Sequence, residues 1–178
     1  MRALDQLGLV EIKPGGARVR PLHEASLDII GPLLDLHDPP DPKLVDQVLE
    51  VHHALFATAV RLTVEQCDDE IIRRARVLLA RIAEARDEAA YFEAEEPLVD
   101  LLVEACGNLA LRLARRALTA QFWNRLQAAG LGLKTPRKLL APLVRDLDKA
   151  FESRNAEEGA KLVYSLMRVH RERIVKEL

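Results

Sequence analysis

Apolar residues recur every three or four positions along most of the chain after residue 42, and no other feature constrains the fold as strongly. Such spacing places apolar side chains on one face of a helix, and that face is stable only when it packs against another element. The segments with this spacing are 42–64, 68–88, 89–106, 109–129, 136–152 and 156–177. Because most connections between them are short, neighbouring helices are expected to run antiparallel. The sequence therefore predicts an all-α fold, an antiparallel bundle of six or seven helices.

Helix-breaking residues mark where the predicted helices begin and end. The segment HDPPDP, residues 37–42, cannot continue a helix, and its Asp41 is a favourable cap for a helix that begins at the following proline. Before this segment, Gly8 is expected to end a short helix, and Ser26 is expected to cap another. Near the other end of the chain, the stretch GLGLKTP, residues 130–136, is expected to form a loop.

The stretch GLVEIKPGGARVRPL, from Gly8 to Leu22, follows a different pattern. Apolar and polar residues alternate on either side of a Lys-Pro-Gly-Gly turn. Alternation with a period of two is typical of a β-strand, and a Pro-Gly turn between two such runs is typical of a hairpin. We therefore predict a short β-hairpin, with strands over residues 9–12 and 17–21, in front of the helical bundle.

The composition excludes several classes of protein. Apolar residues make up 49 % of the chain but aromatic residues only 4 %, so the core must consist mainly of aliphatic side chains. A net charge of −2 lacks the basic excess that is typical of a free-standing nucleic-acid-binding domain. By their spacing, Cys67 and Cys106 form neither a disulfide framework nor a metal-binding pair. Without a signal peptide or an apolar run of about 18 residues, we expect a cytoplasmic protein that does not enter a membrane.

The sequence contains no recognisable motif for catalysis or nucleotide binding. It has no glycine-rich phosphate loop, no nucleophile elbow and no His-Glu-x-x-His zinc motif, so we expect no enzymatic activity. The adjacent His52 and His53 point about 100° apart on a helix, and we interpret them as solvated or partly satisfied side chains rather than metal ligands. The basic clusters at 73–76 and 112–116 are interpreted as solvated helix faces, with an anion site for a phosphate or carboxylate ligand as the alternative.

Several motifs, taken in order along the chain, resemble regulators of the GntR family, in particular its FadR branch. Residues 2–16, RALDQLGLVEIKPGG, look like the end of a winged helix-turn-helix domain, in which a helix leads into a wing with a Pro-Gly tip. Residues 44–62 resemble the first long helix of the ligand-sensing domain in that branch. The Gly107-Asn108 break resembles the small-Gly-Asn interruption before the next helix, and residues 147–160 resemble the start of the final helical hairpin.

This resemblance implies two parts and a regulatory function. Residues 1–21 would be the end of the winged helix-turn-helix domain, and residues 22–178 the helical domain for ligand sensing and dimerisation. The chain would act as a homodimeric repressor or activator that binds a DNA operator through the full-length winged domain and a small-molecule effector in the bundle. The candidates for DNA contact are Lys13, Arg18 and Arg20 on the wing. The alternative is a helical protein-interaction module without a ligand or DNA of its own.

Many members of the branch hold a divalent metal in the helical domain with one Asp and three His residues, and the metal binds a small carboxylate effector. The matching positions here are Glu95, Val99, Val144 and Leu166, with His170 as the alternative to Leu166. Aliphatic side chains cannot ligate a metal, so we expect no metal and no other cofactor. The resemblance then implies an apolar cavity, lined by these residues, for a ligand such as a fatty acyl-coenzyme A, which FadR senses without a metal. The other interpretation, in which these residues fill the core and leave no cavity, stays open.

Overall fold

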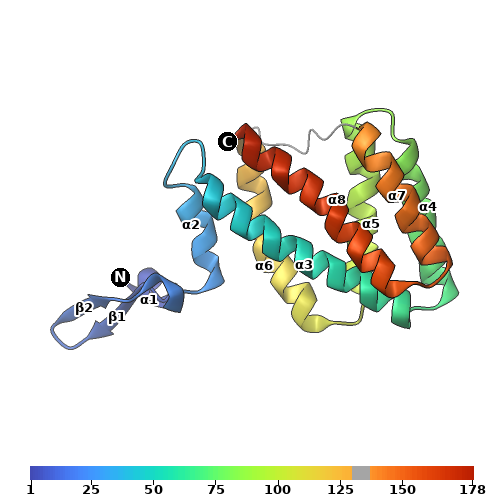
Figure 1. The fold of residues 1–178 in the computed structure, drawn as a ribbon. Helices are drawn as coiled ribbons and strands as arrows, with labels where there is room; N and C mark the ends of the chain where they lie inside the picture. The colour runs from blue at the N-terminus through green and yellow to red at the C-terminus, as the bar shows by residue number, and fades with distance from the viewer. Residues whose placement is uncertain (130–136) are drawn as a thin grey trace.

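The computed structural model describes residues 1–129 and 137–178 of the chain, and Figure 1 shows its fold. Eight α-helices and one two-stranded sheet lie in these two ranges, which confirms the predicted all-α fold with a leading hairpin. The helices are α1 (Arg2–Gln6), α2 (Ile30–Leu34), α3 (Pro42–Gln66), α4 (Asp69–Glu84), α5 (Glu88–Ala105), α6 (Leu109–Ala128), α7 (Arg137–Glu152) and α8 (Ala156–Glu177). The strands are β1 (Val10–Lys13) and β2 (Gly16–Val19), and the 3-10 turns are η1 (Leu22–Glu24) and η2 (Leu27–Ile29). The loop predicted at 130–136 lies outside the described residues.

Side-chain caps explain where the long helices begin. A carboxylate or amide oxygen accepts a hydrogen bond from a backbone N–H two or three residues later, and this satisfies a donor that the first turn leaves unpaired. The capping residues are Asp41, Asp68, Asp87, Asn108 and Asn155. The predicted cap Asp41 precedes α3 as expected, with Pro42 as the first helical residue.

The helices pack around two neighbouring apolar cores. Helices α3 and α8 run alongside each other in opposite directions through the middle of the bundle (Figure 1). At one end, α4, α5 and α7 complete a first core that includes the fully buried side chains of Leu102 and Phe151. At the other end, α2 and α6 complete a second core that includes Leu34 and Phe122. Among the described helices, none combines the length and the apolar character that crossing a membrane requires.

The predicted hairpin is present and projects away from the helical body (Figure 1). Pro14 and Gly15 form a two-residue turn, and Gly15 has the positive φ, 95°, that the second turn position requires. Along the two strands only Val10 is buried. Gly8, with a φ of 74°, ends α1 as the sequence predicted. A hydrogen bond of 2.9 Å from the Ser26 backbone N–H to the Leu7 carbonyl ties α1 to the chain that leads to α2.

Helix α6 connects the bundle to the segment that leads to the hairpin. Leu34 of α2 shares the second core with Leu118 and Phe122 of α6. At the end of α2, the Nε atom of Arg125 donates hydrogen bonds to both carboxylate oxygens of Asp35, at 2.9 and 3.0 Å. Because of these contacts, a displacement of α6 would also displace α2 and the segment that precedes it.

Candidate functional site

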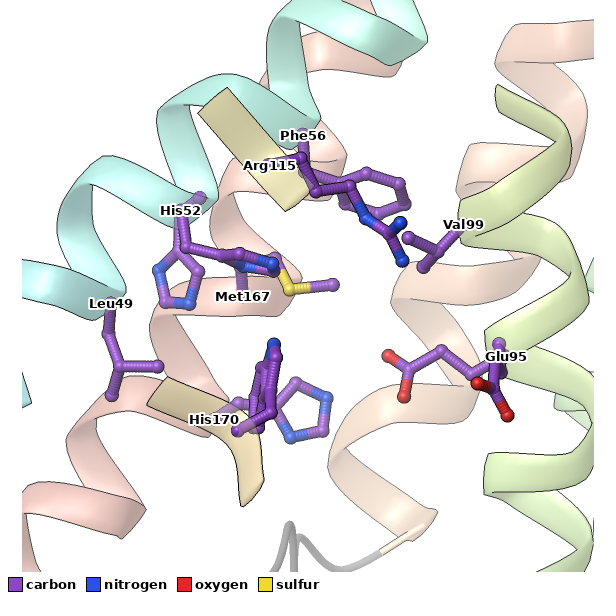
Figure 2. A pocket seen from close by; sticks show the side chains of 11 residues that line it. Leu49, His52, Phe56, Glu95, Val99, Arg115, Met167 and His170 are labelled. Atoms are coloured by element: carbon purple, nitrogen blue, oxygen red, sulfur yellow. The ribbon is translucent and has the colours of Figure 1, made fainter. Parts of the chain in front are cut away.

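A pocket of about 220 Å³ lies inside the bundle, between α3, α5, α6 and α8. Figure 2 shows side chains from these helices around one hollow, with His52, Arg115, Glu95 and His170 approaching it from different helices. The lining residues are Leu49, His52, His53 and Phe56 of α3, Glu95, Glu96 and Val99 of α5, Arg115 and Trp123 of α6, and Met167 and His170 of α8. Polar and apolar side chains therefore share the lining, where the sequence had suggested an apolar cavity.

The structure brings together only part of the candidate set for the cavity. Glu95 and Val99 both line the pocket, because they lie one turn apart on α5. His170, the alternative to Leu166, also lines it. Val144 and Leu166 instead pack in the first apolar core, where both side chains are buried. Each of the two open interpretations thus describes some of these residues, since Val99 faces a cavity while Val144 and Leu166 fill the core.

Two histidines that were interpreted as solvated or partly satisfied are buried parts of the pocket. His52 is 9 % exposed and His53 is 3 % exposed, and the ring of His52 packs edge-on against Trp123 with 5.5 Å between ring centroids. A signal for this burial exists in the sequence. Both histidines continue the three-four spacing of the buried face of α3, which includes Leu49 and Phe56.

Burial keeps the three histidines of the pocket neutral near pH 7. Loss of solvation, together with the nearby charge of Arg115, lowers the pKa of His52 to about 4. For the same main reason, the pKa falls to about 3 for His53 and to about 4 for His170. Neutral imidazoles offer one N–H donor and one acceptor each, so they can bind polar groups without adding charge.

Burial has the opposite effect on Glu95, because its ionised form is the charged one. Loss of solvation raises the pKa of Glu95 to about 7, although a hydrogen bond from the Tyr91 hydroxyl, at 3.4 Å, opposes this shift. The Tyr91 hydroxyl also lies 3.3 Å from the Nε2 atom of His170. Glu95, Tyr91 and His170 therefore form a chain of polar contacts on one side of the pocket, in which Glu95 changes its protonation near neutral pH.

Arg115 lines the pocket and belongs to the basic cluster at 112–116. This cluster was interpreted as a solvated helix face, which is wrong for Arg115. Its side chain is only 24 % exposed, and its Nη2 atom lies 3.1 Å from a carboxylate oxygen of Asp100. Its buried Nε atom has no hydrogen-bond partner among the described residues, and neither does the Nδ1 atom of His52. Buried polar atoms are normally paired, so these two atoms are exceptions within the described part of the chain.

The metal that the resemblance implies does not fit these residues. Val99 and Val144 stand at two of the expected histidine positions and offer no donor atom. Within the described residues, no three His, Cys, Asp or Glu side chains come together in a way that would hold a metal ion. The groups in this pocket that can bind a ligand are its arginine, histidine and carboxyl side chains.

Comparisons with known proteins agree with this architecture. The family model described as "FCD domain" matches residues 47–170, which include all the pocket residues. Among solved structures, a GntR protein of Streptococcus agalactiae is similar in fold, with a TM-score of 0.62 at 15 % sequence identity, over 97 % of this chain and 78 % of that one. No curated protein matches the sequence. Because the family model covers most of the chain, the chain belongs to the FCD domain family, the C-terminal effector-binding domain of GntR-family transcription regulators.

Proposed function

We propose that this chain is the sensing part of a ligand-responsive, DNA-binding transcription regulator of the FadR branch, and that its effector binds in the pocket described above. The observation that carries the proposal is the pocket itself, which lies within the FCD domain and is lined by an arginine, three histidines and a carboxyl group among apolar side chains. A concave site with a few polar groups among apolar ones is the usual form of a small-molecule site. Glu95 and Val99, which the sequence predicted to line the cavity, would be among the residues that contact the effector.

The size of the pocket favours a small effector. A volume of about 220 Å³ lies below the range of roughly 300–1,000 Å³ that is usual for drug-sized ligands. The lining combines apolar side chains such as Phe56 and Met167 with three histidines, a carboxyl group and an arginine. These properties support a small molecule with one apolar part and several polar atoms, in preference to the much larger fatty acyl-coenzyme A.

The signal would reach the N-terminal part of the chain through α6. This helix contributes Arg115 and Trp123 to the pocket and holds α2 through the Arg125–Asp35 pair. A ligand that shifts α6 would therefore also shift the chain that leads to the hairpin. Such an effect requires that the ligand bind one arrangement of these helices more tightly than another.

The hairpin would be the wing of the DNA-binding domain, with residues 1–21 as the end of that domain and 22–178 as the sensor. Lys13, Arg18 and Arg20 lie on the same face of the hairpin, because they alternate with Ile12 and Val19 across the register. Lys13 and Arg20 form exposed ion pairs with Glu11 and Glu24. Exposed pairs are weak, so DNA phosphates would be able to displace the glutamates. Two wings in a homodimer would then contact two half-sites of an operator.

The test is a thermal-shift screen of small metabolites against the wild-type chain and the variant Val99→Phe. The added phenyl ring would fill part of the pocket from the wall of α5, while the polar residues stay unchanged. A compound that raises the Tm of the wild type but not of Val99→Phe would support effector binding at this site. If every stabilising compound acts equally on both proteins, or none acts on either, the pocket is not the effector site and the chain is better explained as an interaction module.

A further inference from the structure

We infer that Cys67 and Cys106 form an oxidisable pair, and that oxidation by a peroxide joins them in an intramolecular disulfide. The two cysteines lie 39 positions apart, and their spacing in the sequence alone predicted no disulfide. In the fold, Cys67 directly follows the last residue of α3, and Cys106 directly follows the last residue of α5. The inference does not depend on the proposed effector pocket, and it adds a site of covalent modification to the FCD domain.

Two side-chain hydrogen bonds hold the end of α3 against the end of α5. The Thr63 hydroxyl donates to the Leu102 carbonyl at 3.1 Å. One turn later along both helices, the Cys67 thiol donates to the Ala105 carbonyl at 3.3 Å. The last turns of the two helices therefore lie side by side, and Cys67 contacts the residue that immediately precedes Cys106.

Covalent geometry limits the distance between the two cysteines. The Ala105 carbonyl oxygen lies about 2.8 Å from the Cα atom of Cys106, since one planar trans peptide joins them. The Sγ atom of Cys67 is 3.3 Å from this oxygen, which places it within about 6 Å of the Cys106 Cα atom. In a disulfide the two Cα atoms are roughly 4.4–6.8 Å apart. We therefore expect side-chain rotation, with little movement of either helix, to close the bond.

The surroundings of the two thiols determine which one reacts first. Cys67 is partly exposed, whereas Cys106 is only 2 % exposed, so a small oxidant meets Cys67 first. Burial raises the pKa of the Cys67 thiol, together with the neighbouring groups of Asp68 and Cys106, which also means that the two thiols are close enough to interact. Since the thiolate is the reactive form, we expect a slow reaction that needs sustained oxidation.

The reaction balances with a peroxide as the oxidant. The Cys67 sulfur attacks one oxygen of hydrogen peroxide, the O–O bond breaks, and the other oxygen leaves as water with the thiol proton. This step converts Cys67 to a sulfenic acid. The Cys106 sulfur then attacks the Cys67 sulfur, the S–O bond breaks, and a second water leaves with the Cys106 proton. Two thiols are oxidised to one disulfide while one peroxide is reduced to two waters.

The disulfide would join α3 to α5, which are two of the four helices that line the interior pocket. It would close a loop of about 40 residues that contains α4. It would also hold the end of α5 directly before Gly107, whose φ of 66° marks the turn into α6. Closing such a loop restricts the unfolded chain, so the oxidised protein should be the more stable form.

The test compares the reduced 178-residue chain with the same chain after treatment with hydrogen peroxide in native buffer. Trypsin releases Cys67 in the peptide 62–73 and Cys106 in the peptide 87–112, and mass spectrometry of alkylated digests detects these two peptides when they are joined. Non-reducing gel electrophoresis separates a bond within one chain from a bond between chains. Cys67→Ala and Cys106→Ala each keep one thiol and are the matched controls. Circular dichroism establishes that each variant is folded.

We expect the joined peptides in the monomeric wild type, with a Tm that rises by at least about 3 °C and returns when dithiothreitol reduces the bond. The Tm of either variant should change by less than about 1 °C after the same treatment. A glutathione redox buffer gives the equilibrium constant for disulfide formation, which should be at least about tenfold larger in the native chain than in urea. Should Cys106→Ala fail to fold, Cys67→Ala and this equilibrium constant still decide the question.

The inference is overturned if the joined peptides do not form in the native protein, if the bond forms only between chains, or if peroxide stops at sulfinic or sulfonic acids. It is also overturned if oxidised Cys67→Ala gains the same Tm as the oxidised wild type. An equilibrium constant that is no larger in the native chain than in urea would likewise overturn it, because the fold would then not hold the two thiols in position.

Discussion

Replacement of Glu95 by glutamine should change how the stability of the protein depends on pH. Burial raises the pKa of Glu95 from 4.5 to about 7 in the folded state. The folded protein therefore holds this proton more tightly than the unfolded chain does. As the pH rises from about 4.5 to about 7, the unfolded chain ionises first, so the free energy of unfolding falls. Glutamine has nearly the same shape and no proton to lose, so this fall should be absent from Glu95→Gln.

The magnitude follows from the two pKa values. The rise of the pKa from 4.5 to about 7 corresponds to roughly 3–4 kcal/mol of differential stability. Most of this change, roughly 2–3 kcal/mol, falls between pH 5 and pH 8. The lowered pKa values of His52, His53 and His170 act in the other direction, because they destabilise the folded state as the pH falls below 6.5. These histidines are present in both proteins, so their contribution cancels in the difference between variant and wild type.

The assay is urea unfolding, followed by circular dichroism, of the wild type and Glu95→Gln at several pH values between 5 and 8. The free energy of unfolding of the variant minus that of the wild type should grow by roughly 2–3 kcal/mol across this range. Glu96→Gln, at the exposed neighbouring position on α5, is the control and should show little change. A difference for Glu95→Gln that stays constant with pH would refute the conclusion that burial keeps this carboxyl group protonated.

Other substitutions test the core, the bundle and the hairpin. Phe151→Ala should lower the free energy of unfolding by about 3–5 kcal/mol, because Phe151 is fully buried, and a loss below about 1 kcal/mol in urea unfolding would contradict this packing. Asp46→Asn should destabilise the protein at neutral pH, and the loss should shrink as the pH falls below 3.8, since the hydrogen bond from Arg171, at 2.7 Å, lowers the pKa of Asp46 and its benefit is lost as the pH falls through that pKa. Urea unfolding that gives the same difference at every pH would count against this ion pair. In a chain with the complete winged domain, Arg18→Ala should reduce the slope of log K for DNA against log salt by about 0.9, and an unchanged slope would argue against a phosphate contact.

The order of the helices was predictable from the sequence because the signals that define it are local. Asp41 acts on backbone groups within one turn, and Gly8 stops a helix through its own φ, so neither depends on distant parts of the chain. The same is true of the Pro14-Gly15 turn, which specifies the hairpin by itself. The spacing of apolar residues predicted the length of each long helix, and the observed ends differ from the predicted ones by a few residues.

The candidate site was less predictable because it depends on which helix faces meet. Glu95 and Val99 share the pocket since one turn of α5 separates them, which is again local. The face of α8 that meets the cavity carries His170, whereas Leu166, one turn away, enters the core. For Arg115, nothing in the neighbouring sequence distinguishes an arginine that α5 and α3 cover from one in water. Its burial follows from tertiary packing.

The division of the bundle into two cores has a consequence for how the protein opens. Proteins unfold locally in cooperative units, and segments that share a core tend to open together. The second core, with Leu34 and Phe122, holds α2 and most of α6, while the first core holds α4, α5, α7 and Leu111 at the start of α6. Both cores share α3 and α8. Amide hydrogens of α2 and α6 should therefore exchange with solvent as one group, separately from those of α4 and α7. A ligand that contacts Arg115 and Trp123 would then slow exchange in α2 as well, so the pocket would control the N-terminal end of the molecule through its local stability.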